Sequence, residues 1–456
     1  MLEDTIAAVA TPLGEGGLAV IRISGPEALA VADRSFAPVG EASVRPSAAA
    51  THTIHFGHVV RDGQTVDEAV LAVMRSPRTF TREDVVEITC HGGILPAKLV
   101  LDTVLANGAR LAEPGEFTRR AFLNGRIDLA QAEAVADLIH SRTELALRAA
   151  NEQLAGKLSQ RINKLRDEML ETLAHVEAHI DFPEEDIAPD TREQLIARLK
   201  NGVSFMDELL RTAREGQILR RGIRAAIIGR PNAGKSSLLN QLLGHDRAIV
   251  SAIPGTTRDT IAETADIRGL PVVFVDTAGL REARDELELE GVRRSRQTLQ
   301  EAELILHVFD AAESLTDADE KYLAEFAAKK RLLIRNKVDL PLRLRFPPNL
   351  KQPVVDVSCL TGQGIEPLKD AIKELAWSGE IRAEMLQVMV NSRHQDALNR
   401  ARAATLQTLA ALEENQTLEL VALDLRIAVN AVGEIVGQTT TEDLLDLIFS
   451  QFCIGK

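Results

Sequence analysis

The sequence predicts a multidomain chain with an N-terminal α+β domain, a discontinuous all-α helical domain, and an α/β unit inserted between the two helical parts. Two changes in hydrophobic period lead to this prediction. Short apolar runs punctuated by glycine and proline give way at Thr118 to a stretch rich in Ala, Leu, Glu, Gln and Arg. At Ile223, apolar runs of strand length begin to alternate with amphipathic segments. The expected domains are residues 1–117, 118–215, 216–378 and 379–456.

The elements of the first and second parts follow from local composition. Apolar runs at residues 19–23, 69–74 and 85–89 favour strands. Long helices are expected over residues 118–180, because strong helix formers dominate there. Asp181-Phe182-Pro183 ends them, and another helical stretch is expected over residues 191–215.

The inserted unit has the pattern of a parallel sheet covered by helices on both faces. Its expected strands are residues 225–228, 272–275, 304–309, 332–334 and 354–357. Helical texture resumes after Leu375, so the helical parts on either side of the unit are expected to form one domain. Such an insertion is favoured where domain termini lie close together at the surface. Two separate helical domains are the alternative.

Composition restricts the class of protein. The 456 residues are 45% hydrophobic and carry a net charge of −14, so nonspecific affinity for a polyanion is not expected from charge alone. No apolar stretch is long enough to span a membrane, and the acidic N-terminus is unlike a secretory signal. The three cysteines are far apart and form no CxxC pair. We therefore expect a cytoplasmic protein with reduced thiols and no membrane partner.

A phosphate-binding motif follows the first strand of the inserted unit. Gly229-Arg230-Pro231-Asn232-Ala233-Gly234-Lys235-Ser236 matches the pattern G-x-x-x-x-G-K-[ST] between a predicted strand and a predicted helix. Glycines let the backbone wrap phosphates, whose charge faces the N–H groups of the helix N-terminus. Lys235 is expected to reach the outer phosphates and the Ser236 hydroxyl to coordinate Mg²⁺.

Two further motifs specify a guanine nucleotide. Asp276-Thr277-Ala278-Gly279 ends a strand, which places Asp276 on the magnesium side and the Gly279 N–H near a γ-phosphate. Asn336-Lys337-Val338-Asp339 follows another strand, and the carboxylate of Asp339 can accept from both the ring N–H and the exocyclic amine of guanine. Adenine lacks that ring N–H, so an ATPase is disfavoured. Ser358-Cys359-Leu360 fits the remaining base-side loop only in part.

The residue that positions the attacking water is not determined by spacing. Leu280 stands after Gly279, where Ras-like GTPases use a nearby glutamine to orient water. The candidates left open by sequence distance are Arg281, Glu282, Arg284, Asp285, Glu286 and Glu288. In the loop Ser251-Ala252-Ile253-Pro254-Gly255-Thr256-Thr257-Arg258-Asp259, Thr257 is a candidate second magnesium ligand. The side-chain carbonyl of Asn232 is a candidate ligand for a monovalent cation.

With these residues assigned, the chain resembles the bacterial and organellar tRNA-modification GTPase family MnmE, also called TrmE, over essentially its whole length. Motifs outside the GTPase unit carry the resemblance: Ala10-Thr11-Pro12, Arg22-Ile23-Ser24-Gly25, Phe80-Thr81-Arg82-Glu83-Asp84, His91-Gly92-Gly93, Pro114-Gly115-Glu116-Phe117, Arg120-Ala121-Phe122-Leu123-Asn124 and Phe452-Cys453-Ile454-Gly455-Lys456.

The resemblance implies a domain plan, a reaction and partners. It implies an N-terminal domain that dimerises and binds a tetrahydrofolate derivative (5-formyl- or methylene-tetrahydrofolate), a discontinuous helical domain, and a Ras-like P-loop G domain set into it. The homodimer would work with the FAD-dependent protein MnmG, in a heterotetramer, on tRNA. The product would carry an aminomethyl or carboxymethylaminomethyl group at C5 of a wobble uridine. Potassium would stimulate GTP hydrolysis and bring two G domains together.

The resemblance also implies site residues. Potassium ligands would be Asn232, Ser251, Ile253 and Thr256, the general acid/base would be Glu288, and folate contacts would be Arg22, Glu87, Arg126 and Lys456. Together, motifs and resemblance predict contacts to GTP or GDP and its cations at Asn232, Ala233, Gly234, Lys235, Ser236, Ser237, Ser251, Ala252, Ile253, Pro254, Gly255, Thr256, Thr257, Asp276, Thr277, Ala278, Gly279, Asn336, Lys337, Asp339 and Ser358. Lys235 is also expected to be catalytic.

The sequence leaves two alternatives for each of two residues, and it leaves a second possible function for the protein. Cys453 is either a small buried hydrophobic residue or a thiol that the tail brings to the folate site, and His91 either lines that site or has a structural role. The rival function is a regulatory GTPase, such as a ribosome-assembly factor. That rival predicts a basic RNA-binding module after the G domain, whereas residues 380–456 are mixed in charge.

Overall fold

The computed structural model describes residues 4–40, 43–181, 192–244, 263–275, 302–317, 319–320, 323, 329–347, 350–377 and 383–456. These residues divide into two compact units. The first unit comprises Met1–Ala136, Leu154–Lys200 and Arg400–Lys456, and the second comprises Asp137–Gln153 and Asn201–Asn399. Within the described residues, no helix is both long enough and apolar enough to cross a bilayer.

The first unit contains a seven-stranded mixed sheet with the order β3-β4-β5-β6-β2-β1-β7. Its strands are β1 (Ile6–Val9), β2 (Leu18–Ser24), β3 (Phe36–Pro38), β4 (Thr53–Arg61), β5 (Gln64–Met74), β6 (Val85–His91) and β7 (Arg110–Leu111). All neighbours pair antiparallel except β1 and β7, which are parallel. The expected α+β character of this part is confirmed.

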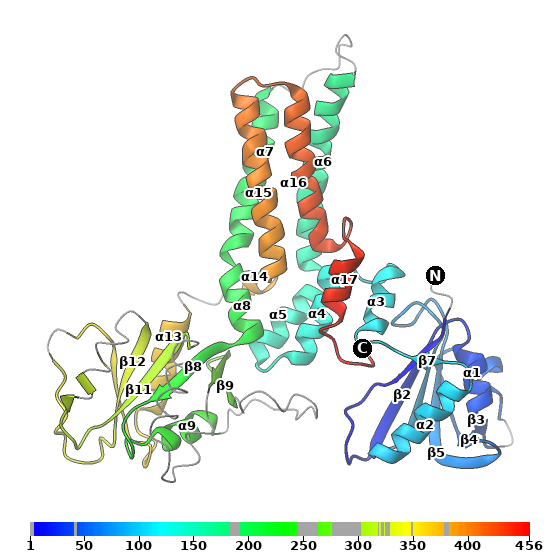
Figure 1. The fold of residues 1–456 in the computed structure, drawn as a ribbon, viewed down its shortest axis with the longest axis horizontal. Helices are drawn as coiled ribbons and strands as arrows, with labels where there is room; N and C mark the ends of the chain where they lie inside the picture. The colour runs from blue at the N-terminus through cyan, green and yellow to red at the C-terminus, as the bar shows by residue number, and fades with distance from the viewer. Residues whose placement is uncertain are drawn as a thin grey trace. The chain divides into compact units, whose positions relative to one another are not determined.

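Helices α1 (Ala28–Ser35) and α2 (Ile94–Ala106) cover one face of this sheet, and a short 3₁₀ helix spans Pro46–Ala48 (Figure 1). Side chains alternate between the two faces of each strand, and the buried residues of β4 and β5 follow this alternation: Gly57 and Val59, and Ala69, Leu71 and Val73. The opposite face leaves Ile54, Phe56 and Val70 exposed, and Phe56 and Val70 are register partners.

Helical segments on both sides of the inserted unit pack together in the first unit. The long helices α6 (Lys157–Asp181) and α16 (Leu418–Val436) lie against each other, and Arg426 donates to Glu177 between them. Nearby, α7 (Arg192–Arg211) and α15 (Ser392–Glu413) are joined by a 2.9 Å contact between Lys200 Nζ and Glu413 Oε1 (Figure 1). The discontinuous helical domain is therefore confirmed, and the alternative of two separate helical domains is wrong.

Shorter helices complete the all-α part of the chain. They are α3 (Glu116–Leu123), α4 (Leu129–His140), α5 (Glu144–Leu154), α8 (Ala213–Arg221), α14 (Ala383–Leu386) and α17 (Glu442–Phe449). Helix α5 contributes Ala146 and Ala149 to the hydrophobic core of the second unit. That core also contains α8 residues, so the inserted sheet is packed against helices from outside it.

The second unit contains a six-stranded sheet with the order β13-β12-β11-β8-β10-β9. Its strands are β8 (Ile223–Ile228), β9 (Glu263–Ile267), β10 (Leu270–Phe274), β11 (Leu304–Asp310), β12 (Lys330–Asn336) and β13 (Val354–Val357), and the helices α9 (Lys235–Leu243) and α13 (Ile365–Ala376) share one core with it. The five expected strands pair parallel, which confirms the expectation of a parallel sheet for them. The additional edge strand β9, which was not expected, pairs antiparallel with β10 across the tight turn at Arg268-Gly269.

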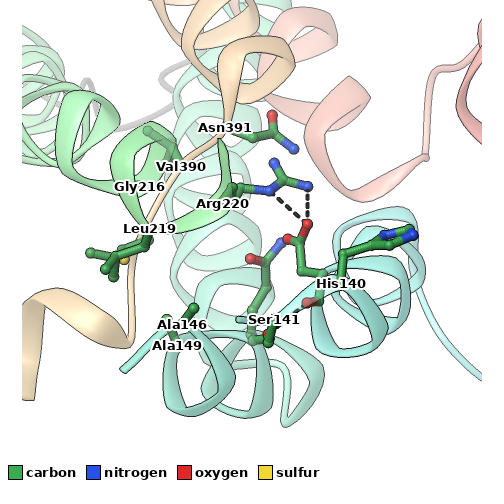
Figure 2. Close-up of a pocket in the computed structure, with 13 residues that line it drawn as sticks. His140, Ser141, Ala146, Ala149, Gly216, Leu219, Arg220, Val390 and Asn391 are labelled. Carbon is green, nitrogen blue, oxygen red and sulfur yellow. Dashed lines mark hydrogen bonds and ion pairs between the residues drawn. The ribbon is translucent and has the colours of Figure 1, made fainter. Parts of the chain in front are cut away.

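A small cavity lies where α4, α5, α8 and residues 389–391 meet in the second unit (Figure 2). The guanidinium of Arg220 points at the Asp137 carboxylate, with Nε and Oδ1 2.7 Å apart, and Ser141 donates to the Asp137 carbonyl at 2.7 Å. The volume of this cavity is about 30 Å³, room for one or two water molecules. It is too small for a nucleotide.

Candidate functional site: a nucleotide pocket and an arginine–glutamate pair

The phosphate loop joins β8 to α9 through backbone conformations that few residues adopt. Gly229 has φ +148°, Asn232 φ +62° and Gly234 φ +96°. A Cβ at Gly229 would lie 2.2 Å from the Val308 carbonyl oxygen, and one at Gly234 would lie 2.0 Å from the Asn336 side-chain nitrogen. Glycine at both positions therefore lets the loop approach its neighbours, and asparagine tolerates the left-handed conformation better than most residues.

The side chain of Lys235 folds back onto the phosphate loop that precedes it. Lys235 is the first residue of α9, and its Nζ donates to the carbonyls of Gly229 at 3.0 Å and Arg230 at 2.8 Å. Burial lowers the pKa of Lys235 from its ordinary value, because desolvation disfavours the charged ammonium. A phosphate entering the loop would restore a counter-charge to this ammonium.

The base-side loops are connected to the phosphate loop by one asparagine. The buried amide of Asn336 donates to the Ala233 carbonyl at 2.9 Å and accepts the Cys359 N–H at 3.1 Å. The Asp339 carboxylate accepts from the Ser358 hydroxyl at 2.5 Å. Burial, and then the charge of Asp339, raise the pKa of the Cys359 thiol to about 11. Although the motif around Ser358 matches only in part, Ser358 contacts the carboxylate that is expected to bind guanine.

These loops line a single pocket of about 670 Å³, which lies within the usual range for small-molecule sites. Its lining residues are Pro231, Asn232, Gly234, Lys235, Ser236, Ser237, Asn336, Lys337, Asp339, Leu340, Cys359 and Leu360. The ammonium and helix N-terminus at one end suit phosphates, and the Asp339 carboxylate at the other suits a guanine edge. Ala233 is buried behind this surface.

Other predicted nucleotide and cation contacts lie outside the described residues. These are Ser251, Ala252, Ile253, Pro254, Gly255, Thr256, Thr257, Asp276, Thr277, Ala278, Gly279 and Glu288, together with the alternatives Arg281, Glu282, Arg284, Asp285 and Glu286. Among the described residues, no group of three or more His, Cys, Asp or Glu side chains could hold a metal ion. Ser236 itself is exposed at the start of α9.

Two of the residues implied as folate contacts meet in the first unit, and the residue before a third, Lys456, reaches them. Arg22 on β2 and Glu87 on β6 are cross-strand register partners, and Arg22 Nε donates to Glu87 Oε1 at 2.8 Å. A second nitrogen of Arg22 donates to the carbonyl of Gly455 at 3.3 Å. The C-terminal tail, including Lys456, therefore returns to the sheet beside this pair. Gly455 has φ +93°, and a Cβ there would lie 2.4 Å from the Val9 carbonyl oxygen.

The fourth implied contact is linked to this pair through aromatic rings. Arg126 donates to the Thr79 carbonyl at 3.0 Å, and its guanidinium carbon lies 4.9 Å from the centroid of the Phe80 ring. The Arg22 guanidinium carbon lies 5.7 Å from the centroid of Phe117, and Phe80 packs against the cluster that contains Phe117. Both rings fall in sequence motifs quoted above, but residue spacing did not indicate that they stack under arginines.

The structure excludes one alternative for Cys453 and gives His91 a hydrogen-bond partner. Cys453 is exposed, so its interpretation as a small buried hydrophobic residue is wrong. His91, four residues along β6 from Glu87, is exposed, and its Nδ1 lies 2.7 Å from Asp67 Oδ1. The hydrogen bond to Asp67 raises the pKa of His91 above its ordinary value. His91 therefore has an acidic partner of its own in the sheet.

The fold and the pocket define a guanine-nucleotide-binding protein of the phosphate-loop class. Family models match nearly all of the chain: "GTP-binding protein TrmE N-terminus" over residues 5–126 and "MnmE helical domain" over residues 129–453. The chain belongs to the MnmE family of tRNA modification GTPases. Curated proteins named tRNA modification GTPase MnmE are 49% identical in Geobacillus kaustophilus (99% of each chain covered) and 48% in Geobacter metallireducens (100% of each). The Bacillus subtilis protein of that name is 47% identical over 99% of this chain and 100% of that protein.

Solved structures align with a smaller part of the chain. The G domain of the FeoB iron transporter of T. maritima is 26% identical, with a TM-score of 0.25, over 34% of this chain and 99% of that one. The FeoB G domain of Methanococcus jannaschii is 25% identical, with the same TM-score of 0.25, over 34% of this chain and 97% of that one.

Proposed function

We propose that this tRNA-modification GTPase couples GTP hydrolysis to the addition of an aminomethyl or carboxymethylaminomethyl group at C5 of a tRNA wobble uridine. The work would be done in the cytoplasm with the FAD-dependent partner MnmG, and a tetrahydrofolate derivative would supply the one-carbon unit. One observation carries the nucleotide half of the proposal. A single 670 Å³ pocket is bounded by Lys235 at one end and Asp339 at the other.

In this pocket the chain's own residues bind and orient GTP. Lys235 would leave the carbonyls of Gly229 and Arg230 for the β- and γ-phosphates, while Asp339 accepts from the guanine edge. Ser236, at the start of α9, and Thr257 would hold Mg²⁺, which offsets charge on the phosphates. Glu288 is the proposed general acid/base for the attacking water, in place of the glutamine that Ras-like GTPases use.

A monovalent cation is proposed beside the phosphates, with Asn232, Ser251, Ile253 and Thr256 as its ligands. Asn232 supports this assignment because it lines the pocket in a left-handed conformation within the phosphate loop. K⁺ at this place would add positive charge where negative charge develops in the transition state, and would stimulate pairing of two G domains.

The cation proposal is tested by GTP turnover in potassium and in sodium, for the wild type and Asn232→Ala. We expect faster turnover in potassium for the wild type and no difference between the salts for the variant. Asn240→Ala, which removes an exposed asparagine of α9, is the matched control and should keep the potassium response. Equal wild-type rates in both salts would refute the cation-assisted mechanism.

A folate site is proposed around the Arg22–Glu87 pair, with Arg126 and Lys456. Arginine offers a forked donor to a glutamyl carboxylate, and Glu87 can accept from the amine-bearing edge of a pterin. The return of the tail to Arg22 supports this proposal, because it adds Lys456 and exposed Cys453 to the surroundings of the pair.

Calorimetry with 5-formyl-tetrahydrofolate tests the folate site. Arg22→Ala should weaken folate affinity by about tenfold or more, since a hydrogen bond to a charged group contributes roughly 1.5–3 kcal/mol. GTP turnover should be retained. Arg61→Ala, which removes a more exposed arginine of the same sheet, should leave folate affinity unchanged. Unaltered affinity in Arg22→Ala would refute the assignment.

A homodimer formed through the N-terminal domain is also proposed, as part of a heterotetramer with MnmG. The sheet face opposite α1 and α2 supports it, because Ile54, Phe56 and Val70 are exposed there side by side. Phe56→Asp should convert the dimer to a monomer in light scattering. Val44→Asp, at an exposed valine of the same domain, should remain dimeric. A monomeric wild type would contradict the proposal.

A further inference from the structure

The last residue of β11 and the residues after it contact both loops of the nucleotide pocket. We refer to residues 310–317 and 319 as the post-β11 segment. Asp310 opens it, and Asp310 Oδ2 lies 2.6 Å from the Nζ of Lys337 in the base-side loop. The other carboxylate oxygen of Asp310 accepts the Ala312 N–H at 2.9 Å. Both oxygens of this largely buried carboxylate are therefore engaged, and Lys337 has a fixed anionic partner.

The same segment holds the phosphate loop through Arg230. Arg230 Nε donates to Asp319 Oδ1 at 2.9 Å, and a terminal nitrogen donates to the Ser314 carbonyl at 3.1 Å. Glu313 lies at the edge of this contact, 3.4 Å from the guanidinium. The Asp319 side chain is only 4% exposed, and Asp319 also accepts from the N–H and the hydroxyl of Thr316. The guanidinium of Arg230, a residue of the phosphate loop, is thus bound by carboxylates that lie outside the nucleotide pocket.

Arg230 connects this contact to the lysine of the phosphate motif. The carbonyl of Arg230 accepts from Lys235 Nζ at 2.8 Å, while its side chain is held by Asp319. The carbonyl of Gly229, which also accepts from Lys235 Nζ, is restrained as well, because Gly229 packs too closely on Val308 for any side chain. The orientation of the Arg230 peptide therefore determines where the Lys235 ammonium rests before a phosphate arrives.

We propose that the post-β11 segment positions both lysines of the nucleotide pocket. Asp310 would orient Lys337 directly, and Asp319 would orient Lys235 through the side chain and carbonyl of Arg230. Lysine has a long, flexible side chain, so fixing its position beforehand lowers the entropy lost when nucleotide binds. Asp310, Asp319 and Arg230 are positioning residues, because none of them needs to touch the nucleotide. This role rests on the guanine-nucleotide function proposed above.

The test measures affinity for fluorescent GDP in Asp310→Asn, Asp319→Asn and the double variant. Each single variant should bind GDP about tenfold more weakly, because a charge-assisted hydrogen bond is lost. The two losses should multiply, because the carboxylates hold different loops. Asp317→Asn is the matched control, since it removes the same charge from an exposed position of the same segment, and it should change affinity less than twofold.

Competition with GMP separates positioning from general destabilisation. Loss of the Asp319 contact should lower the ratio of GDP affinity to GMP affinity, because Lys235 serves the outer phosphates. Asp310→Asn should leave this ratio unchanged, because Lys337 serves the base end. If Asp319→Asn does not fold, as judged by circular dichroism, Arg230→Gln removes the same contact from the phosphate loop.

The outcomes separate this proposal from the proposed function. A wild type that binds no GDP would contradict the nucleotide function itself. A wild type that binds GDP, with Asp310→Asn and Asp319→Asn indistinguishable from Asp317→Asn, would overturn only the positioning role. An unchanged ratio of GDP to GMP affinity in both Asp319→Asn and Arg230→Gln would overturn the indirect positioning of Lys235.

Discussion

The side-chain amide of Asn336 donates to the main-chain carbonyl of Ala233 at 2.9 Å, which ties the base-side loop to the phosphate loop. The same amide accepts the N–H of Cys359 at 3.1 Å, so one buried side chain joins three loops. The two ends of the pocket therefore keep a fixed separation, which is what a ligand with a base at one end and phosphates at the other requires.

Replacing Asn336 with alanine should impair nucleotide binding. Two backbone groups would lose their buried partner, at a cost of about 1–3 kcal/mol for each group, so GDP affinity should fall by at least about tenfold. Equilibrium titration with fluorescent GDP measures this loss. Glu374→Ala, at an exposed position of α13, should bind GDP as the wild type does. Wild-type affinity in Asn336→Ala would contradict the role of the amide.

Ser358→Ala should weaken GDP binding by releasing Asp339. The Ser358 hydroxyl donates to Asp339 at 2.5 Å and accepts the Thr361 N–H at 3.2 Å, so it fixes the carboxylate that is expected to recognise guanine. Loss of such a hydrogen bond is worth about 1 kcal/mol, or roughly fivefold in affinity. Gln363→Ala, nearby on an exposed turn, is the control. Unchanged GDP affinity in Ser358→Ala would show that Asp339 does not need this support.

Gly455→Ala should displace the C-terminal tail from Arg22. The φ of +93° at Gly455 disfavours any side chain, and the new Cβ would lie 2.4 Å from the Val9 carbonyl. Folate affinity should therefore fall, while GTP turnover remains that of the wild type. Calorimetry with 5-formyl-tetrahydrofolate measures the folate affinity, and release of the terminal residues by carboxypeptidase measures the displacement of the tail. Gln451→Ala should alter neither, and a Gly455→Ala tail as resistant to digestion as the wild type would refute displacement.

The three thiols should react with iodoacetamide in an order set by exposure and pKa. Cys453 is exposed and should react first. Burial raises the pKa of Cys90 and of Cys359 from 9.0 to about 11. Near pH 8 the reactive thiolate is then about a hundredfold scarcer for these two residues than for an unperturbed thiol, and labelling should accelerate as the pH rises. Mass mapping measures the order, and GDP should further protect Cys359. Labelling of Cys359 as fast as Cys453 at pH 8 would contradict the partly buried environment of Cys359.

Sequence reasoning found what depends on local chemistry. The phosphate loop and Asp339 were predictable because phosphate and guanine binding require particular residue types at close spacing, and β11 and β13 follow their apolar runs within one residue. Contacts set by tertiary register were not predictable in this way. Arg22 and Glu87 are 65 positions apart, and only the pairing of β2 with β6 brings them together. The edge strand β9 was missed because Glu263-Thr264-Ala265-Asp266-Ile267 is not a continuous apolar run.

Calorimetry with GDP, ADP and XDP in the presence of Mg²⁺ tests the central claim, that Lys235 and Asp339 bind the two ends of one guanine nucleotide. The wild type should bind GDP at micromolar concentration or tighter and disfavour ADP by roughly 10⁴-fold, because adenine offers the Asp339 carboxylate no ring N–H and leaves it without its partner. Asp339→Asn should transfer the preference to XDP, whose second carbonyl can accept from the new amide. Equal affinity of the wild type for GDP and ADP, or an Asp339→Asn variant that still prefers GDP, would contradict the account.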